Sequence, residues 1–472
     1  MAAMRVHTCR ACSGGGARHA RGHDGWLSSS HSRSSSLQHS RWRSQASSEE
    51  KQTMDTKTHI NHGYASSSYQ RAWAAEPASS FAKAVKTLIL TKEEPTGTQV
   101  LLRVLVAGVN GGCETFRCRA EHWFERNNAN DDGFAVGAEG CAIVEALGPD
   151  AAEVPSQAAA YGADVDGTGK LAVGDIVAFV GGAFSEYVTA PSPERLVRIA
   201  PAGAVHDVNA GDVAAIHISG AIAVCALYHQ ADLRHGERVV VTTAAGGTGQ
   251  FAVQLALMRG CHVVATCGTE TKRRALELLC EQYLLPVDCN QHDEEDGFRH
   301  VREAKEGGSL RFVNSRSTEC RDAIRAALDQ AGGDADVIYE GVGGAMRETC
   351  LDVLNADGGR LLVIGYISEY PHTTTTTTTT TTNGVPPSEK LFWSASDVTD
   401  SRGARVIGNV WGKRVAEGRK LAYDLWRDGK LRVMLDNCGV VDGDIGSRAT
   451  YAVERMLGGD TCGKCILHVS DM

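Results

Sequence analysis

The residues best suited to chemistry form a run of small residues, Ala244–Gly249, within the segment Val239–Ala256. An apolar strand precedes this run and a helical pattern follows it, so backbone N–H groups and the helix dipole should favour a pyrophosphate at the start of the helix. Gly246 would let the backbone approach the phosphates, and Gly249 would let the helix pack against the strand. Ala244 replaces the first glycine of the usual fingerprint. The segment predicts a dinucleotide site, and the alternative is a plain strand–helix turn.

The next strand distinguishes between the two nicotinamide cofactors. It ends within Thr266–Arg274, where Gly268 and Thr269 stand at the tip in place of the acidic residue that holds the ribose hydroxyls of NAD. Glu270 falls just past the tip. Lys272 and the two arginines after it would bind a 2′-phosphate, so we predict NADPH. The alternative is that Lys272 and its neighbours form a solvated helix face.

The elements that must position this turn fall into three sections. Short strands with Gly turns in 69–206 predict a β-barrel-like unit, and alternating strands and helices in 207–408 predict a parallel sheet wrapped by helices. Residues 409–472 are too few to stand alone and are expected to complete the first section. Two segments, Asp293–Ser317 and the threonine run Thr373–Thr382, are interpreted as loop insertions. The expected strands are 100–106, 135–148, 173–180, 184–189, 237–243, 261–266, 336–340, 360–365 and 465–469, and the expected helices are 249–259, 271–281 and 413–428.

Composition limits the classes of function. The chain has 472 residues and a formal net charge of −9, which disfavours a broadly basic nucleic-acid surface. No run of the roughly 18 apolar residues that a membrane helix needs is evident, so we expect neither nucleic acid nor membrane as a partner. The 15 cysteines are interpreted mostly as small buried residues in a reducing compartment.

The N-terminal arm, residues 1–57, differs from the rest. Up to Ser48 its only acidic residue is Asp24, while arginine and serine are frequent. This composition is typical of mitochondrial or plastid transit peptides. The alternative is a disordered tail or a misassigned start, which would leave the protein in the cytoplasm.

The ordered motifs resemble the medium-chain dehydrogenase/reductase superfamily, and within it the zinc-free quinone oxidoreductase branch that includes the prostaglandin reductases. The motifs are Gly108–Asn110, Gly137–Gly140, Val173–Asp175, Ala244–Gly249 and Tyr339–Gly344. The resemblance implies an α/β fold in which a doubly wound Rossmann sheet is inserted into a GroES-like β-barrel catalytic domain, with the cofactor in the cleft. A homodimer is also expected.

The resemblance also carries over site residues. It implies that the pyrophosphate, the 2′-phosphate, the ribose and the nicotinamide are held by Gly246, Gly247, Thr248, Gly249, Gly268, Thr269, Lys272, Gly341, Ile364, Tyr370, Asn409, Val410, Trp411 and Thr461. Tyr370 matches a tyrosine that contacts the nicotinamide ribose in prostaglandin reductases. A tyrosine of the family is replaced by Cys289, and the threonine run follows Tyr370 closely, so the substrate is less well specified than the cofactor.

Zinc is not expected. The two positions that hold catalytic zinc in alcohol dehydrogenases correspond to Asn110 and Ala138 here, and no cysteine quartet suits a structural zinc. The pairs Cys113–Cys118 and Cys462–Cys465 lack second pairs.

The function expected from these features is hydride transfer from NADPH to the double bond of an α,β-unsaturated ketone, such as a 15-oxoprostaglandin-like enone, or to a quinone. Tyr370 and Asn110 are the candidate catalytic residues, with hydrogen-bond donors stabilising the charge on the carbonyl oxygen. The alternatives are that Tyr370 is a packed aromatic residue and that Asn110 is a turn residue, neither with a catalytic role. For the whole chain, the alternatives are a zinc-type alcohol dehydrogenase and a non-catalytic NADPH-binding protein of crystallin-like or regulatory type.

Overall fold

The computed structural model describes residues 68–118, 133–157, 169–286, 298, 301–370, 384–393, 397–408, 414–438 and 442–470. These residues belong to one compact unit that begins at Ala65. The N-terminal arm, the threonine run, Cys289 and residues 409–413 lie outside the described residues, and the predictions made for them stay predictions.

The second section forms a mostly parallel sheet with strand β9 (Arg238–Val241) near its centre. Strands on one side of β9 are β10 (His262–Cys267), β12 (Ser309–Asn314) and the antiparallel edge strand β11 (Val301–Glu303). On the other side are β13 (Val337–Glu340), β14 (Arg360–Val363), β16 (Arg405–Ile407) and the antiparallel edge strand β15 (Val398–Thr399). The strands that follow β9 in the sequence are thus added to the sheet on both sides of β9. In such sheets, ligands bind at the carboxyl ends of the strands where the strand order reverses.

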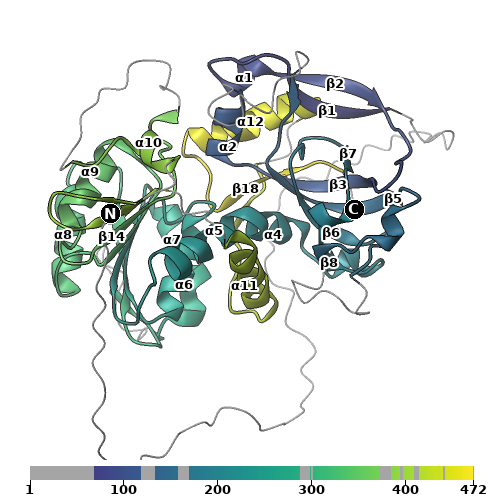
Figure 1. Ribbon diagram of the computed structural model, residues 1–472. Coiled ribbons are helices and arrows are strands. Elements are labelled where there is room, and N and C mark those ends of the chain that lie inside the picture. Colours follow the sequence, from purple (N-terminus) through teal and green to yellow (C-terminus); the bar gives the residue numbers. More distant parts are fainter. Residues whose placement is uncertain are drawn as a thin grey trace, which may run out of the picture. The chain divides into compact units, whose positions relative to one another are not determined.

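Helices cover both faces of this sheet (Figure 1). Alternate residues of β9 enter different cores: Val239 and Val241 pack in one, and Val240 packs in the other. This alternation is the period of two that a strand buried on both faces requires. The first core includes α6 (Gly249–Met258) and α7 (Glu270–Cys280), and the second includes α8 (Cys320–Gln330), α9 (Gly344–Val353) and α10 (Ser388–Phe392).

The first section forms a seven-stranded, mostly antiparallel sheet centred on β3 (Val100–Gly108). Its other strands are β5 (Glu139–Leu147), β6 (Ile176–Val180), β7 (Tyr187–Ala190), β8 (Val197–Ala200), β17 (Leu435–Asp436) and β18 (Lys464–His468). Strand β18 comes from the last section and pairs with β3, so the first and last sections of the chain share one sheet.

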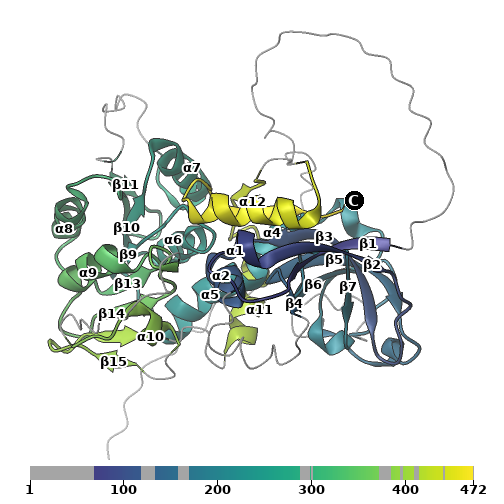
Figure 2. The same ribbon diagram turned by 90° about the horizontal axis from the view of Figure 1, so that it is seen from above.

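A smaller sheet lies beside it and orders β2 (Val85–Thr91), β1 (Ser68–Ala74) and β4 (Phe134–Ala135). Helix α12 (Ile445–Leu457) packs across β1 and β2 (Figure 2). The remaining elements are α1 (Phe81–Ala84), α2 (Gly111–Cys118), α11 (Val415–Arg427), η1 (Ala151–Glu153), η3 (Pro193–Arg195), η4 (Ala204–His206) and η7 (Glu281–Tyr283). The last section was expected to contain one helix, near 413–428, and a closing strand at 465–469; α11 and β18 agree with this, whereas helix α12 was not anticipated.

One long helix, Ala210–Gln230, joins the barrel to the Rossmann sheet. It runs through α4 (Ala210–Ala215), η5 (Ile216–Gly220), α5 (Ala221–Val224) and η6 (Cys225–Gln230), of which η5 and η6 are π-helical. Its length and mean hydropathy of 1.7 would allow it to cross a membrane, so the expectation that the sequence contains no apolar stretch of this length was wrong. However, 94% of its apolar window is buried within the protein, as in a core helix.

One further expectation was wrong in detail. The predicted loop Asp293–Ser317 contains β11 and β12, and β12 pairs with β10 inside the central sheet. Cysteine was expected to be mostly reduced and buried. Ten described cysteines are free and seven of these are buried, but Cys438 and Cys465 form a disulfide.

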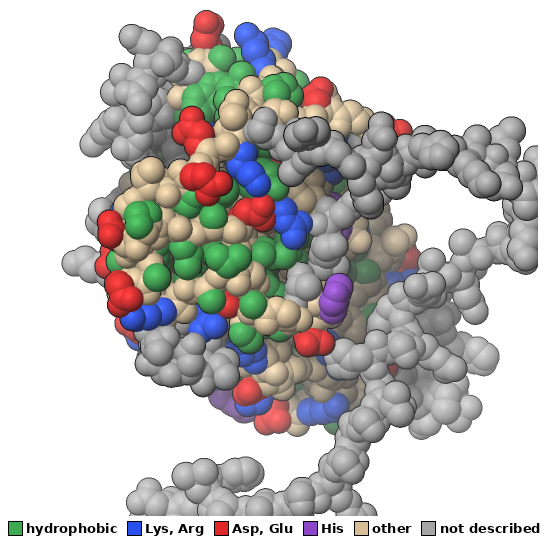
Figure 3. Space-filling model, turned by 90° about the vertical axis from the view of Figure 1, so that its right-hand side faces the viewer, with side chains coloured by type: hydrophobic (Ala, Val, Ile, Leu, Met, Phe, Trp, Pro, Cys, Tyr) green, Lys and Arg blue, Asp and Glu red, His purple; other side chains and the backbone are tan. Residues whose placement is uncertain are grey.

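Figure 3 shows acidic and basic side chains intermingled on the barrel side of the molecule, without a large face of one sign.

Candidate cofactor and substrate cleft

A cleft of about 810 Å³ opens at the carboxyl ends of β9, β10 and β13. Its walls include the Gly-rich turn after β9, the start of α2 and the start of β18. The residue before β18 contacts the turn directly, because the Gly463 N–H donates to the Ala245 carbonyl at 2.8 Å. The barrel and the Rossmann sheet therefore build this cleft together.

The Gly-rich turn is closely packed. Thr243 has a φ of 49°, a left-handed conformation that is strained for a β-branched residue and is often found at functional sites. A Cβ on Gly249 would lie 2.3 Å from the Thr243 carbonyl oxygen, so only glycine fits where α6 begins. The Thr248 hydroxyl is 2.6 Å from the Tyr339 hydroxyl and donates to the Ser219 carbonyl at 3.0 Å, which ties the turn to β13 and to the π-helical η5.

The end of the cleft beside β10 carries positive charge. Lys272 and Arg316 both line it, together with Gly268 and Thr461. The Lys272 ammonium donates to the Gly459 carbonyl at 2.5 Å, and burial lowers its pKa. Neither cation forms an ion pair with a carboxylate in the part of the chain that the structure describes. A Cβ on Gly268 would lie 2.9 Å from the Arg316 side chain, so the small residue at the strand tip makes room for the guanidinium.

The two arginines after Lys272 do not share this position. Arg273 is buried and donates to Glu270 and Glu277 at 2.7–2.9 Å, and Arg274 donates to Glu270 from an exposed side chain at 2.7 Å. Neither lines the cleft, so the expectation that they meet a 2′-phosphate was wrong. Glu270 is neutralised by the same pairs, and its hydrogen bond to Arg273 helps lower its pKa to about 2.

Gly341 and Ile364 also line the cleft. The turn after β13 is held by Glu340, whose carboxylate accepts from the backbone N–H of Val342 at 2.6 Å and of Gly343 at 3.1 Å. Glu340 is fully buried, and burial raises its pKa to about 7.

An aromatic group closes one side of the cleft. Phe116, Tyr370, Phe392 and Trp393 line it, and the rings of Phe116 and Tyr370 meet edge to face with centroids 5.1 Å apart. The Tyr370 hydroxyl accepts from the Tyr366 N–H at 3.3 Å, and burial raises its pKa. This wall suits a flat apolar molecule.

A buried polar cluster lies on the wall formed by β18. The Lys464 ammonium donates to Glu139 Oε1 at 2.6 Å, to Asn110 Oδ1 at 2.7 Å and to Ser219 Oγ at 3.1 Å. The Asn110 Nδ2 group donates to Glu139 Oε1 at 2.8 Å. The side chains of Lys464 and Glu139 are 2% and 0% exposed, whereas Asn110 is half-buried and faces the cleft.

The structure brings most of the predicted site residues together. Ten of them line the cleft: Asn110, Gly246, Gly247, Thr248, Gly268, Lys272, Gly341, Ile364, Tyr370 and Thr461. Gly249 is buried behind the turn, and the Thr269 side chain accepts from the Lys272 N–H as the cap of α7. Asn409, Val410 and Trp411 lie outside the described residues.

The sequence analysis missed Arg316, Glu139 and Lys464 as site residues. Arg316 stood in a segment interpreted as a loop. Glu139 stood inside the motif Gly137–Gly140, and Lys464 stood directly before the expected strand 465–469. A charged residue in or beside a short strand that must be buried was the available signal.

Within the described ranges, no three His, Cys, Asp or Glu side chains lie close enough to hold a metal ion. Cys465, one of the paired cysteines considered for zinc, is bonded to Cys438. That the protein works without zinc stays a prediction.

Comparisons with known proteins agree with this geometry. The sequence model of a family described as zinc-binding dehydrogenase matches residues 247–385. Prostaglandin reductase-3 of Mus musculus is 31% identical over 264 residues, which are 56% of this chain and 55% of that protein. The Bos taurus protein of the same name is 32% identical over 225 residues, 48% of each chain. The chain thus spans about half the length of the curated relatives it matches.

Solved structures show the same fold. CurA from Vibrio vulnificus in complex with NADPH superimposes with a TM-score of 0.58 at 15% identity, over 85% of this chain and 100% of that one. A quinone oxidoreductase from Pseudomonas syringae gives a TM-score of 0.56 at 18% identity, over 85% and 99%. The expected fold class and the resemblance to the medium-chain dehydrogenase/reductases are confirmed.

Proposed function

We propose that this chain, a member of the medium-chain dehydrogenase/reductase superfamily, is an NADPH-dependent reductase of an α,β-unsaturated ketone or a quinone. The observation that carries the proposal is the cleft itself. It combines a turn of small residues at a helix N-terminus, two cations that form no ion pair within the described ranges, and an aromatic wall.

The cleft residues fit NADPH. Gly246 and Gly247 have no side chain to block the approach of a pyrophosphate to the start of α6, where helix polarity favours negative charge. Lys272 and Arg316 would then hold the 2′-phosphate, since neither cation has a carboxylate partner among the described residues. The relatives named prostaglandin reductase-3 and the NADPH-bound neighbour support this choice.

When bound, NADPH supplies a hydride from C4 of its nicotinamide ring. The chain's own task is to place a flat acceptor beside that ring and to stabilise the negative charge that develops on the acceptor's carbonyl oxygen. The aromatic wall around Phe116 and Trp393 would hold the acceptor, and Tyr370 and Asn110 are the polar groups that face the cleft beside it. Solvent supplies the proton that completes the product.

The test is oxidation of NADPH, followed at 340 nm, against a panel of enones and quinones with the purified chain. Turnover of at least one compound is expected, and Tyr370→Phe should lower kcat on it. No turnover of any compound, with NADPH nevertheless bound, would favour the second candidate, a non-catalytic NADPH-binding protein. If Tyr370→Phe leaves kcat unchanged, the catalytic assignment of Tyr370 is wrong.

The homodimer, the domain boundaries and the organellar or cytoplasmic location remain proposals. Size-exclusion chromatography with light scattering tests the first, and imaging of a fusion protein that retains residues 1–57 tests the last.

A further inference from the structure

The buried cluster on β18 fixes which atom of Asn110 faces the cleft. Oδ1 of Asn110 is 2.7 Å from the Lys464 ammonium, and Nδ2 is 2.8 Å from the Glu139 carboxylate. Exchanging the amide's nitrogen and oxygen would place N–H groups against an ammonium and an oxygen against a carboxylate. Ammonium groups only donate and carboxylates only accept, so this exchange is strongly disfavoured.

The arrangement leaves one hydrogen-bonding capacity of Asn110 uncommitted. Nδ2 carries two hydrogens and only one meets Glu139, while the second has no acceptor among the described residues. Because Asn110 lines the cleft, this second N–H is available to a bound molecule. Lys464, in contrast, uses its three ammonium hydrogens on Asn110, Glu139 and Ser219 and has none left for the substrate.

The backbone is shaped around the same cluster. A Cβ on Gly108 would lie 2.7 Å from Oε1 of Glu139, so the glycine two residues before Asn110 leaves room for the carboxylate. The side chain of Lys464 runs beside the Gly-rich turn, and a Cβ added to Gly247 would lie 3.2 Å from the Cδ of Lys464. The motifs Gly108–Asn110 and Gly137–Gly140 therefore meet at one point with the segment Gly463–Lys464.

We propose that Lys464 and Glu139 are positioning residues that lock the Asn110 amide with its N–H toward the cleft, so that Asn110 donates a hydrogen bond to the carbonyl oxygen of the substrate. The inference rests on the proposed reductase function and specifies it. The substrate must present an acceptor oxygen to Asn110, as an enone or quinone does, and the two buried charges act only through this amide.

The test is a mutant cycle measured on a compound that the wild-type chain reduces. Asn110→Ala should lower kcat about 100-fold, as the loss of one oxyanion donor does. The double variant Glu139→Gln/Lys464→Met removes both buried charges together, which avoids leaving either one unpaired. It should lower kcat about 10-fold or more, because the amide is then free to turn.

The decisive comparison is the same double variant in the Asn110→Ala background. In this background the double variant should lower kcat by less than a further factor of about two, since the effects of residues that act through one group are not additive. If it lowers kcat as much as it does in the wild-type background, Lys464 and Glu139 act independently of Asn110, for instance as a proton source, and the proposal is overturned. Arg198→Met is the matched control: it removes the cation of a buried pair with Asp175 in the barrel, and it should change stability but not kcat.

A second measurement does not depend on turnover. The side-chain amide of Asn110, assigned by the loss of its NMR signals in Asn110→Ala, should show one proton shifted by the carboxylate in the NADPH complex. Glu139→Gln should abolish that difference, and unchanged signals would contradict the lock. If the wild-type chain reduces no enone or quinone, the proposed function fails, whereas an altered Asn110 signal would still show the lock.

Discussion

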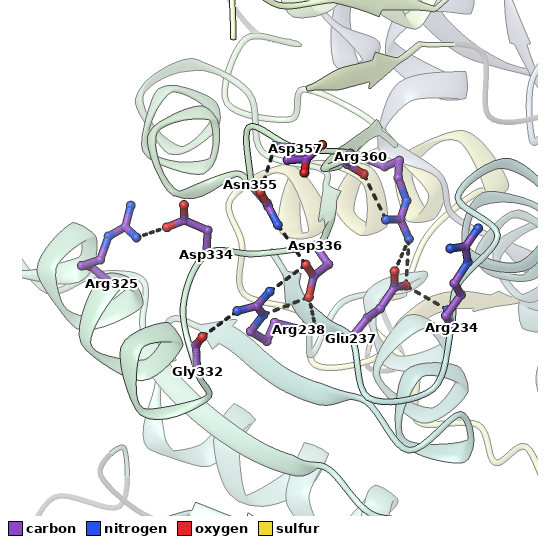
Figure 4. A network of polar contacts seen from close by, with 11 residues as sticks. Arg234, Glu237, Arg238, Arg325, Gly332, Asp334, Asp336, Asn355, Asp357 and Arg360 are labelled. Carbon is purple, nitrogen blue, oxygen red and sulfur yellow. Dashed lines mark hydrogen bonds and ion pairs between the residues drawn. The ribbon is translucent and has the colours of Figure 1, made fainter. Parts of the chain in front are cut away.

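The two ends of the Rossmann strands treat charge in opposite ways. At the amino ends, the Arg238 guanidinium donates to both oxygens of Asp336 at 2.8 and 2.9 Å, and Arg360 donates to Glu237 at 2.7 and 2.8 Å (Figure 4). At the carboxyl ends, Lys272 and Arg316 have no carboxylate partner among the described residues. One end is neutralised by the protein itself, and the other end retains positive charge that a phosphate could neutralise.

The difference separates stability from binding. Paired charges at the amino ends hold the turns that connect the strands, so their loss should reduce the free energy of unfolding without altering the cleft. The cations at the carboxyl ends form no ion pair among the described residues, and Lys272 contributes only its hydrogen bond to the Gly459 carbonyl, so their loss should mainly reduce cofactor affinity. Four predictions, each with its own variants, test this separation and its limits.

The largest effect is expected at the Gly-rich turn, where packing and binding coincide. In Gly249→Ala the new Cβ would lie 2.3 Å from the Thr243 carbonyl oxygen and 2.9 Å from the Ala244 Cα, and backbone atoms cannot rotate away. The free energy of unfolding should fall by roughly 3 kcal/mol, and NADPH binding should be lost. Chemical denaturation and fluorescence titration measure both. Gly220→Ala is the control, because its nearest atom would be 3.4 Å away. Equal stability of both variants would refute the close packing.

Breaking the network at the amino ends comes next. Arg238→Met keeps the apolar stem but leaves the half-buried Asp336 without its cation, which should cost roughly 1–3 kcal/mol of unfolding free energy. The dissociation constant of NADPH should not change. Arg321→Met, which breaks the exposed pair with Asp352, should cost under about 1 kcal/mol. A loss of NADPH affinity in Arg238→Met would mean that the two ends are not independent.

Removing the cations at the carboxyl ends should have the reverse outcome. Lys272→Ala and Arg316→Ala should each weaken NADPH binding about 10- to 100-fold, the value of a charge-assisted hydrogen bond, and leave NADH binding and the melting temperature nearly unchanged. Arg274→Ala is the control, because this exposed arginine of the same helix is paired with Glu270. The 2′-phosphate assignment fails if both cofactors lose affinity equally.

The smallest effect concerns pH. Burial raises the pKa of Glu340 to about 7 from an ordinary value of 4.5. The folded state therefore keeps a proton that the unfolded state has released, and this contribution to stability is present below pH 4.5 and is lost as the pH rises through 7. Between pH 6 and 8 the loss should be about 1 kcal/mol. Glu340→Gln should flatten the dependence of the melting temperature on pH, whereas the exposed Glu94→Gln should not. A steeper curve for Glu340→Gln would contradict the shift.

Much of this could be predicted from the sequence, because local patterns decide it. The apolar strand before Ala244–Gly249 and the alternation of strands and helices located the turn and the sheet. The tip of β10 was recognised from Gly268 and Thr269, because an absent acidic residue is visible in the sequence itself.

The rest depends on contacts between distant parts of the chain. Arg316 follows strand β12, which was not predicted because charged residues flank it in the sequence. Its place in the cleft depends on the pairing of β12 with β10. Arg273 was misassigned because a run of basic residues in the sequence does not show which of them form ion pairs with nearby acidic residues, as Arg273 does with Glu270 and Glu277. Lys464 and Asn110 are separated by 354 positions in the sequence and meet only because β18 pairs with β3.

The most direct test of the account is the ratio of the dissociation constants of NADH and NADPH for the wild-type chain, measured by fluorescence titration at one ionic strength. NADPH should bind at least about tenfold more tightly, corresponding to roughly 1.4 kcal/mol of interaction with the 2′-phosphate. Equal affinities, or a preference for NADH, would contradict it.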